Sequence, residues 1–86
     1  MKTFYDPCYL AAMTILKEYR LNSNMTQQEL ALLLCCDQGY ISKYESGQRR
    51  LDIIEIRKIC KQLGISLIDF AEDLETKIKE DNLDDG

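Results

Sequence analysis

The sequence predicts an all-α fold, a compact bundle of five helices that forms a single domain. Eighty-six residues, 45% of them hydrophobic, suffice for one core and are too few for two. One proline and four glycines leave few breaks, which favours long helices over many short strands. Polar residues that can cap a helix, each followed by apolar residues at helical spacing, recur five times along the chain.

The first two helices are predicted from their start signals. The first is expected from Pro7 to about Arg20, because Asp6 can cap it and proline suits the first helical position. The second is expected to begin after Thr26, which forms a capping-box pattern with Glu29 three residues later. The residues on their inward stripes are Tyr9, Met13, Leu16, Arg20, Leu30, Ala31 and Leu34.

The third helix follows after a very short connection. It is expected from Gln38 to about Ser46, with Asp37 able to cap it and Gly47 able to end it. Two helices about three residues apart, the second short and polar on one side, have the spacing of a helix-turn-helix.

The last two helices also begin with capping patterns. Asp52 with Glu55 starts the fourth, which Gly64 ends, and Ser66 with Asp69 starts the fifth. Their expected apolar sets are Ile53, Ile56, Ile59, Cys60 and Leu63, then Leu67, Phe70, Leu74 and Ile78. Residues 1–79 are therefore expected to form the domain, and the acidic tail 80–86 to be disordered.

Charge is distributed unevenly along the chain. The formal net charge is −4, yet residues 1–50 carry six basic and five acidic side chains, whereas residues 51–86 carry five and ten. An acidic total argues against avid non-specific binding of nucleic acid, because such binding depends on neutralising phosphates. A basic patch confined to the first half is still compatible with DNA binding.

Several classes of protein are not expected from the composition. The N-terminus does not resemble a signal peptide, and the longest apolar run, residues 30–36, is too short to cross a membrane, so a cytoplasmic protein without membrane contact is expected. The cysteines, Cys8, Cys35, Cys36 and Cys60, are expected to be buried apolar thiols in a reducing compartment. Without histidine or a C-x-x-C pair, neither zinc nor any other cofactor is expected, and no nucleophile–base arrangement indicates an enzyme.

The stretch "QGYISKYESGQRR", residues 38–50, contains the candidate binding residues. Ile41 and Tyr44, three apart, can face the core, which leaves Gln38 and Lys43 on the opposite side together with Gly39. Glutamine can donate to and accept from adenine, and lysine can donate to guanine O6 and N7.

The longer stretch "MTQQELALLLCCDQGYISKYESGQRRLDIIEIRKICKQLGISLIDF" resembles the Xre/Cro/C1-type helix-turn-helix family, the group of the lambda repressor and Cro. The residues at positions of the family's pattern are Met25-Thr26-Gln27, Leu30-Ala31, Ile41-Ser42, Glu45, Gly47 and Arg49. The resemblance covers about residues 10 to 72. It implies a lambda-repressor-like bundle whose third helix enters the major groove of double-stranded DNA.

The resemblance assigns roles to individual residues. Base readout falls to Gln38, Gly39, Tyr40, Ser42 and Lys43, where Gly39 permits close approach and Tyr40 meets a thymine methyl or a phosphate. Phosphate contacts fall to Gln27, Gln48, Arg49 and Arg50, with Gln27 also bracing Gln38. The alternative for the two arginines is a solvated loop, or pairing with the helix dipole.

Arg20 and Glu45 are implied to form a structural ion pair. In the family an arginine near the end of the first helix pairs with a glutamate on the third, and both positions match. Arg20→Ala is therefore expected to damage folding more than base recognition, since a stranded buried charge is costly. The alternative is a weak surface pair.

Three features depart from the family's pattern. Cys35 stands where glycine is usual, in the turn between the second and third helices, and a left-handed conformation there costs cysteine roughly 1 kcal/mol more than glycine. Asp37 places a negative charge near the proposed phosphates. Leu32 and Leu33 replace residues that are usually polar, either as ordinary surface leucines or as a patch for a partner.

The function expected is a small sequence-specific transcriptional regulator, simplest as a repressor, that binds a palindromic operator as a homodimer. The dimer interface is expected on the fifth helix, and its candidate residues are Leu67, Phe70, Leu74 and Ile78. The alternative is that these four residues pack within one chain. The alternative function is a protein-interaction module, such as an antitoxin, whose main partner is a protein and whose DNA binding is secondary.

Overall fold

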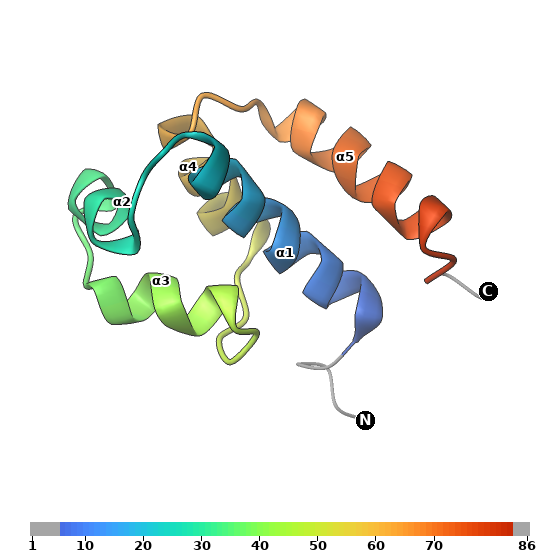
Figure 1. Cartoon of the computed structure of the whole chain (residues 1–86), viewed down its shortest axis with the longest axis horizontal. Helices are drawn as coiled ribbons and strands as arrows, with labels where there is room; N and C mark the ends of the chain where they lie inside the picture. The colour runs from blue at the N-terminus through green and yellow to red at the C-terminus, as the bar shows by residue number, and fades with distance from the viewer. Residues whose placement is uncertain (1–5, 84–86) are drawn as a thin grey trace.

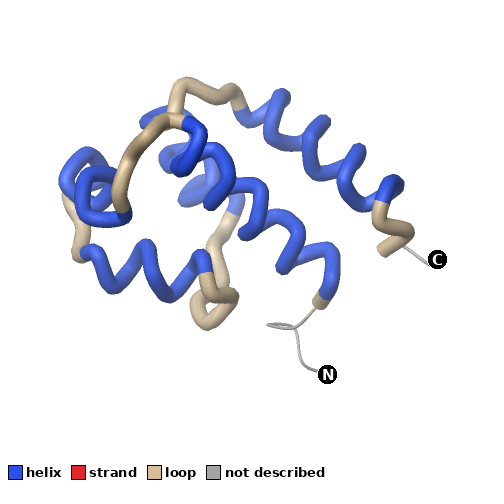
Figure 2. The backbone as a smooth tube through the Cα atoms, in the orientation of Figure 1, coloured by secondary structure: helices blue, strands red, loops and turns tan. Residues whose placement is uncertain are grey.

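The computed structural model describes residues 6–83, and all of its regular elements are helices (Figures 1 and 2). Residues 1–5 and 84–86 lie outside the described part. The five helices are α1 Pro7–Asn22, α2 Gln27–Leu34, α3 Gln38–Glu45, α4 Ile53–Gln62 and α5 Leu67–Glu80. The prediction of an all-α, five-helix fold is confirmed.

The helices begin where the sequence predicted, and four of the five have a side-chain cap. Asp6 accepts hydrogen bonds from the backbone N–H groups of Cys8 and Tyr9. The capping boxes at the starts of α2 and α4 are both formed, and the Ser66 hydroxyl caps α5. Asp37 is the exception: it occupies the N-cap position of α3, but its side chain makes no capping hydrogen bond. The expected cap at Asp37 is therefore absent.

All five helices end with a residue in the left-handed conformation, where the chain turns away from the helix axis. These residues are Asn24, Cys35, Gly47, Gly64 and Asn82. After each, a backbone N–H reaches back five residues, as from Cys36 to the Ala31 carbonyl at 2.9 Å. At the end of α5, Leu83 donates in the same way to Ile78 at 3.0 Å. Within the predicted tail, Glu80 is the last residue of α5 and the turn to Leu83 follows it, while residues 84–86 lie outside the described part.

The core lies between α1 and the other four helices. Its fully buried side chains are Met13, Leu16, Leu30, Ile41, Tyr44, Ile59 and Cys60. Ile53 was expected to face inward but is 57% exposed, because it is the first residue of α4 and lies beyond the edge of the core. Cys36 is half-buried at the margin of the core.

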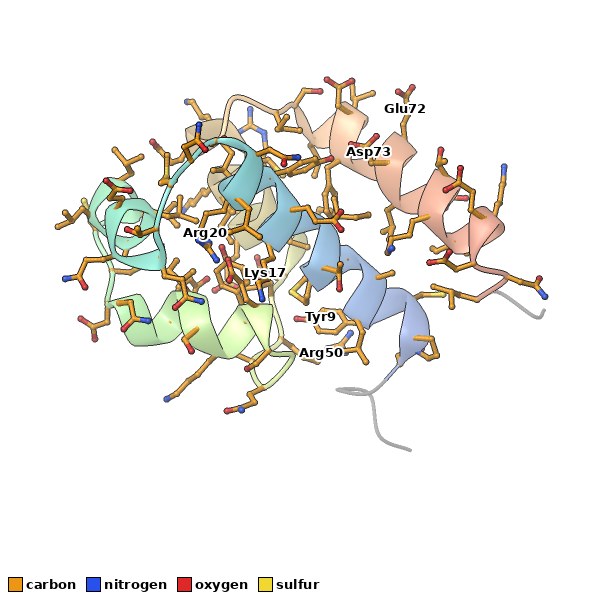
Figure 3. All side chains as sticks on the ribbon, in the orientation of Figure 1. Tyr9, Lys17, Arg20, Arg50, Glu72 and Asp73 are labelled. Carbon is orange, nitrogen blue, oxygen red and sulfur yellow. The ribbon has the colours of Figure 1, made fainter. Side chains whose placement is uncertain are left out.

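α1 lies between α3 on one side and α5 on the other, and packs against both (Figure 1). The inner face of α5 covers α1: Phe70 is buried and meets the Tyr19 ring edge-on with centroids 6.5 Å apart. The Tyr19 hydroxyl also donates to the Asp73 carboxylate, next to α1 in Figure 3. Both contacts fasten α5 to α1.

The packing of α5 bears on the residues expected at the dimer interface. Phe70 is taken up by the core, Leu67 and Leu74 pack against it, and Ile78 is half-buried. Packing within one chain thus accounts for Phe70, Leu67 and Leu74, and a dimer interface on α5 stays a prediction. The outer face of α5 carries Ile68 and Glu72, and Glu72 points away from the bundle in Figure 3.

Candidate nucleic-acid interface

α3 has one buried side and one open side. Ile41 and Tyr44 have no exposed surface, and they hold the helix against α1 and α2. Gln38, Gly39 and Lys43 are exposed on the other side. Ser42 is half-buried beside them. A Cβ added to Gly39 would meet no heavy atom within 4 Å, so the backbone at this point is open to close approach.

A chain of side-chain hydrogen bonds fixes the first residue of α3. Gln38 Nε2 donates to Gln27 Oε1 at 2.6 Å, and Gln27 Nε2 donates to Glu45 Oε1 at 3.0 Å. Gln27 is the first residue of α2, so the start of α2 holds the start of α3. The exposed amide of Gln38 is thereby oriented before anything binds to it.

Glu45 is held in turn by Arg20 of α1. Arg20 Nε donates to Glu45 Oε2 at 2.7 Å and Arg20 Nη2 to Glu45 Oε1 at 2.9 Å, a two-pronged pair. The side chains are only 7% and 3% exposed. The hydrogen bonds with Glu45 raise the pKa of the Arg20 guanidinium, although burial opposes this. Arg20 Nη1 also donates to the carbonyl of Met25 at 2.7 Å, so one guanidinium joins α1, the following turn and α3.

Tyr40 points towards α4 instead of outward with Gln38 and Lys43. Its hydroxyl donates to Glu55 Oε2 at 3.2 Å, and its ring meets Tyr44 edge-on at 5.6 Å. Burial, followed by the negative charge of Glu55, raises the pKa of Tyr40. Arg49 closes the cluster: its guanidinium carbon lies 4.8 Å from the centre of the Tyr40 ring, and its Nη2 lies 3.0 Å from Glu55 Oε2.

Tyr9 of α1 holds the loop between α3 and α4. Its hydroxyl donates to the Arg49 carbonyl at 2.9 Å and accepts from the Leu51 N–H at 3.1 Å. The Arg50 guanidinium lies 4.2 Å from the centre of the Tyr9 ring, and the two side chains lie together in Figure 3. Gln48 is exposed in the same loop. The loop carrying the predicted phosphate contacts is thus anchored to the first helix.

A shallow hollow of about 530 Å³ adjoins the start of α3. It is lined by Cys35, Cys36, Asp37, Gly39, Tyr40, Lys43 and Arg49. Arg49 and Lys43 thus share one surface, although they come from different segments.

The expectation of buried thiols is wrong for most of the cysteines: Cys35 is exposed, Cys8 and Cys36 are half-buried, and Cys60 alone is buried. Burial raises the pKa of the Cys60 thiol to about 11.

Two residues of this surface were not singled out from the sequence as part of it. Glu55 was predicted only as the capping-box residue of α4, and Tyr9 only as a residue of the inward stripe of α1. Neither role on the surface has a local sequence signal, because the partners lie 6 to 42 residues away in the chain.

Among residues 6–83 no group of three or more His, Cys, Asp or Glu side chains is placed to hold a metal ion. No helix there is long and apolar enough to cross a membrane.

A short turn between two packed helices, with the second helix open on its outer side, defines a helix-turn-helix protein. Residues 16–70 match the family described as helix-turn-helix. The chain belongs to that family and, within it, to the Xre type of DNA-binding transcriptional regulators.

Three known proteins illustrate the relationship. An uncharacterised HTH-type transcriptional regulator of Bacillus subtilis, YqaF, is 32% identical over 69 residues, which are 80% of this chain and 91% of that protein. The control protein C.BamHI of Bacillus amyloliquefaciens is 39% identical over 59 residues, 64% of this chain and 73% of its own. The structure of an XRE-family like protein from Pseudomonas syringae superposes with a TM-score of 0.79 at 35% identity, covering 87% of this chain and 92% of that one.

Proposed function

We propose that the protein represses transcription by binding a palindromic operator as a homodimer, with α3 of each subunit in the major groove. The observation that carries this proposal is the orientation of α3: its apolar side is buried, and Gln38 and Lys43 are presented outward, Gln38 in a fixed orientation. A helix supported in this way can enter a groove without losing its packing. The two copies would lie one helical turn of DNA apart, about 34 Å.

Base readout is assigned to the open side of α3. Gln38 can make paired hydrogen bonds to adenine, and Lys43 can donate to guanine. Gly39 leaves room for a base edge or backbone to approach, and Ser42 can donate to or accept from a base. Tyr40 supports α3 and Arg49 in this proposal, since its hydroxyl is already donated to Glu55.

Positioning on the duplex is assigned to residues at helix ends. Gln27 lies at the start of α2, where free N–H groups and the helix dipole favour a phosphate. Gln48, Arg49 and Arg50 follow α3 in an exposed loop. Such contacts fix register but carry little sequence information. Repression by occupying promoter DNA requires no DNA-contacting surface beyond these.

The protein-interaction function remains the second candidate. It is favoured by Leu32 and Leu33 on the outer side of α2, which are 73% and 49% exposed beside a hollow that Met25 also lines. Binding to genomic fragments at two salt concentrations separates the candidates. A regulator selects particular sites and weakens steeply with salt, whereas an interaction module selects none.

The proposed reading face is tested by selecting bound sites from a random DNA pool with the parent, Gln38→Ala and Lys43→Ala. Each variant is expected to relax the preference at one position of each half-site, because a good base contact contributes about 1–3 kcal/mol of discrimination. The matched controls are Gln62→Ala and Lys58→Ala, which remove the same groups from exposed positions on α4. If both α3 variants recover the parent's motif unchanged, the assignment of the reading face is wrong.

A further inference from the structure

Glu55 has two separate tasks that its two carboxylate oxygens divide between them. Oε1 accepts the backbone N–H of Asp52 at 2.8 Å and completes the capping box of α4. Oε2 faces the other way and binds Arg49 at 3.0 Å and the Tyr40 hydroxyl at 3.2 Å. The first task is structural, whereas the second engages a side chain of the proposed DNA-binding surface.

Glu29 shows that a glutamate can complete a capping box without also binding an arginine. It completes the equivalent box at the start of α2, where its Oε1 accepts the Thr26 N–H at 2.8 Å. No cation is bonded to Glu29 within residues 6–83. The two glutamates thus have the same local role, and only Glu55 is joined to an arginine.

Arg49 is held in place but remains accessible. Its side chain is 46% exposed and lines the hollow that Gly39 and Lys43 also line. In the free protein one edge of the guanidinium is bonded to Glu55, and the Tyr40 ring covers one of its faces. A phosphate oxygen binds a guanidinium with the same geometry as a carboxylate oxygen does. Glu55 therefore occupies a position on Arg49 that a DNA phosphate could also use.

We propose that Glu55 is an internal competitor for Arg49, a positioning residue that keeps this arginine from the DNA backbone until a phosphate replaces the carboxylate. This inference rests on the proposed function, in which Arg49 contacts a phosphate. It assigns to Glu55 a lowering of affinity that applies to every DNA sequence, because the exchange takes place at the backbone. The dependence on base sequence then comes from α3 alone.

The test is a double-variant cycle on DNA affinity with Glu55→Gln, Arg49→Gln and both together, on a fixed operator selected with the parent. Glutamine retains an oxygen for the Asp52 N–H, since the capping box accepts either residue. Glu55→Gln is expected to tighten binding roughly two- to fivefold, the range of an exposed ion pair. In the Arg49→Gln background the same change is expected to have less than about half of that effect, because no arginine is left to release.

Glu29→Gln serves as the matched control, since it removes one negative charge and preserves a capping box without freeing an arginine. It measures the gain that follows from net charge alone. Thermal melts of the free variants verify that both boxes remain formed. Coupling between Glu55 and Arg49 that exceeds the Glu29→Gln gain supports the proposal.

Two results overturn it. Equal tightening by Glu55→Gln with and without Arg49 would mean that only net charge matters. Weaker binding by Glu55→Gln would mean that the carboxylate presents Arg49 to the DNA instead of withholding it. Failure of the proposed function is recognised separately: the parent then selects no operator, or Arg49→Gln binds as the parent does.

Discussion

Cys35 differs in kind from the other residues that close the helices of residues 6–83. Those four left-handed positions are occupied by glycine or asparagine, which tolerate the conformation, whereas Cys35 has φ 57° and ψ 44° with a full side chain. The turn between α2 and α3 therefore keeps the geometry of a glycine turn despite the cysteine. The energetic cost of the left-handed conformation therefore arises in the turn of the helix-turn-helix.

Cys35→Gly is expected to stabilise the protein by about 0.5–1 kcal/mol. Relief of the left-handed conformation contributes about 1–2 kcal/mol, and the greater freedom of glycine in the unfolded chain takes back about 0.4–1 kcal/mol. Urea unfolding of both proteins measures the difference. Cys35→Ala is the control, because alanine removes the thiol and retains the strain. A glycine variant no more stable than the alanine variant would contradict this explanation.

At the scale of single residues, the sequence predicted conformations better than contacts. The left-handed conformation of Cys35 was expected from the resemblance, because glycine is usual at that position of the family. The thiol's exposure, the direction of Tyr40 and the bond from Tyr40 to Glu55 did not follow, because they depend on how α3 and α4 pack. Helical spacing placed Tyr44 in the core, but it did not show that Tyr40 is half-buried against the core beside α4.

At the scale of helices, Arg20 and Glu45 join α1 to α3 through two hydrogen bonds with almost no exposed surface. Because the pair is buried, the energy expected for a buried ion pair applies to it instead of the energy of an exposed one. An exposed pair contributes under about 1 kcal/mol, whereas removing one partner of a buried pair costs about 3–5 kcal/mol. Glu45 also accepts from Gln27, so the pair supports the orientation of Gln38 as well.

Arg20→Ala is accordingly expected to lower the free energy of unfolding by about 3–5 kcal/mol, because Glu45 keeps a buried charge without its main partner. Thermal or urea unfolding gives the value. The double variant Arg20→Met/Glu45→Met is the control; it should recover much of the loss, since no charge is stranded. If Arg20→Ala unfolds at the same temperature as the parent, the pair contributes little to stability.

The starts of the helices could be predicted because capping is local, whereas the burial of a helix face depends on the neighbouring helices. A cap is a bond between residues two or three apart, so Thr26, Asp52 and Ser66 could be identified from spacing. Asp37 occupies a cap position without the bond, and spacing cannot distinguish the two cases. Ile53 continues the apolar period of α4 but lies past the edge of the core. Periodicity identifies a stripe and does not determine how far the neighbouring helices cover it.

At the scale of the whole molecule, the proposed homodimer requires an apolar surface that the single chain leaves uncovered. Ile68 on the outer side of α5 is 72% exposed and lies between two hollows of opposite charge. One is lined by Arg57 and Lys61 of α4, the other by Glu72 and Glu75 of α5. None of these four charges has an ion-pair partner within residues 6–83. Because a two-fold axis brings the same surface of both subunits together, a surface with both signs beside one apolar residue can complement a copy of itself, and we propose this surface for the homodimer.

Ile68→Glu is therefore expected to weaken self-association at least about tenfold, because it places a charge at the centre of the contact and beside Glu72 and Glu75. Operator affinity should fall with it, since each half-site would then be bound independently. Sedimentation equilibrium over a range of protein concentrations measures the first effect, and titration of operator against half-operator DNA the second. Leu32→Glu is the matched control: Leu32 is 73% exposed, but on α2. If Leu32→Glu dissociates the protein and Ile68→Glu does not, the subunits meet through α2, and the acidic and basic hollows beside Ile68 have no part in assembly.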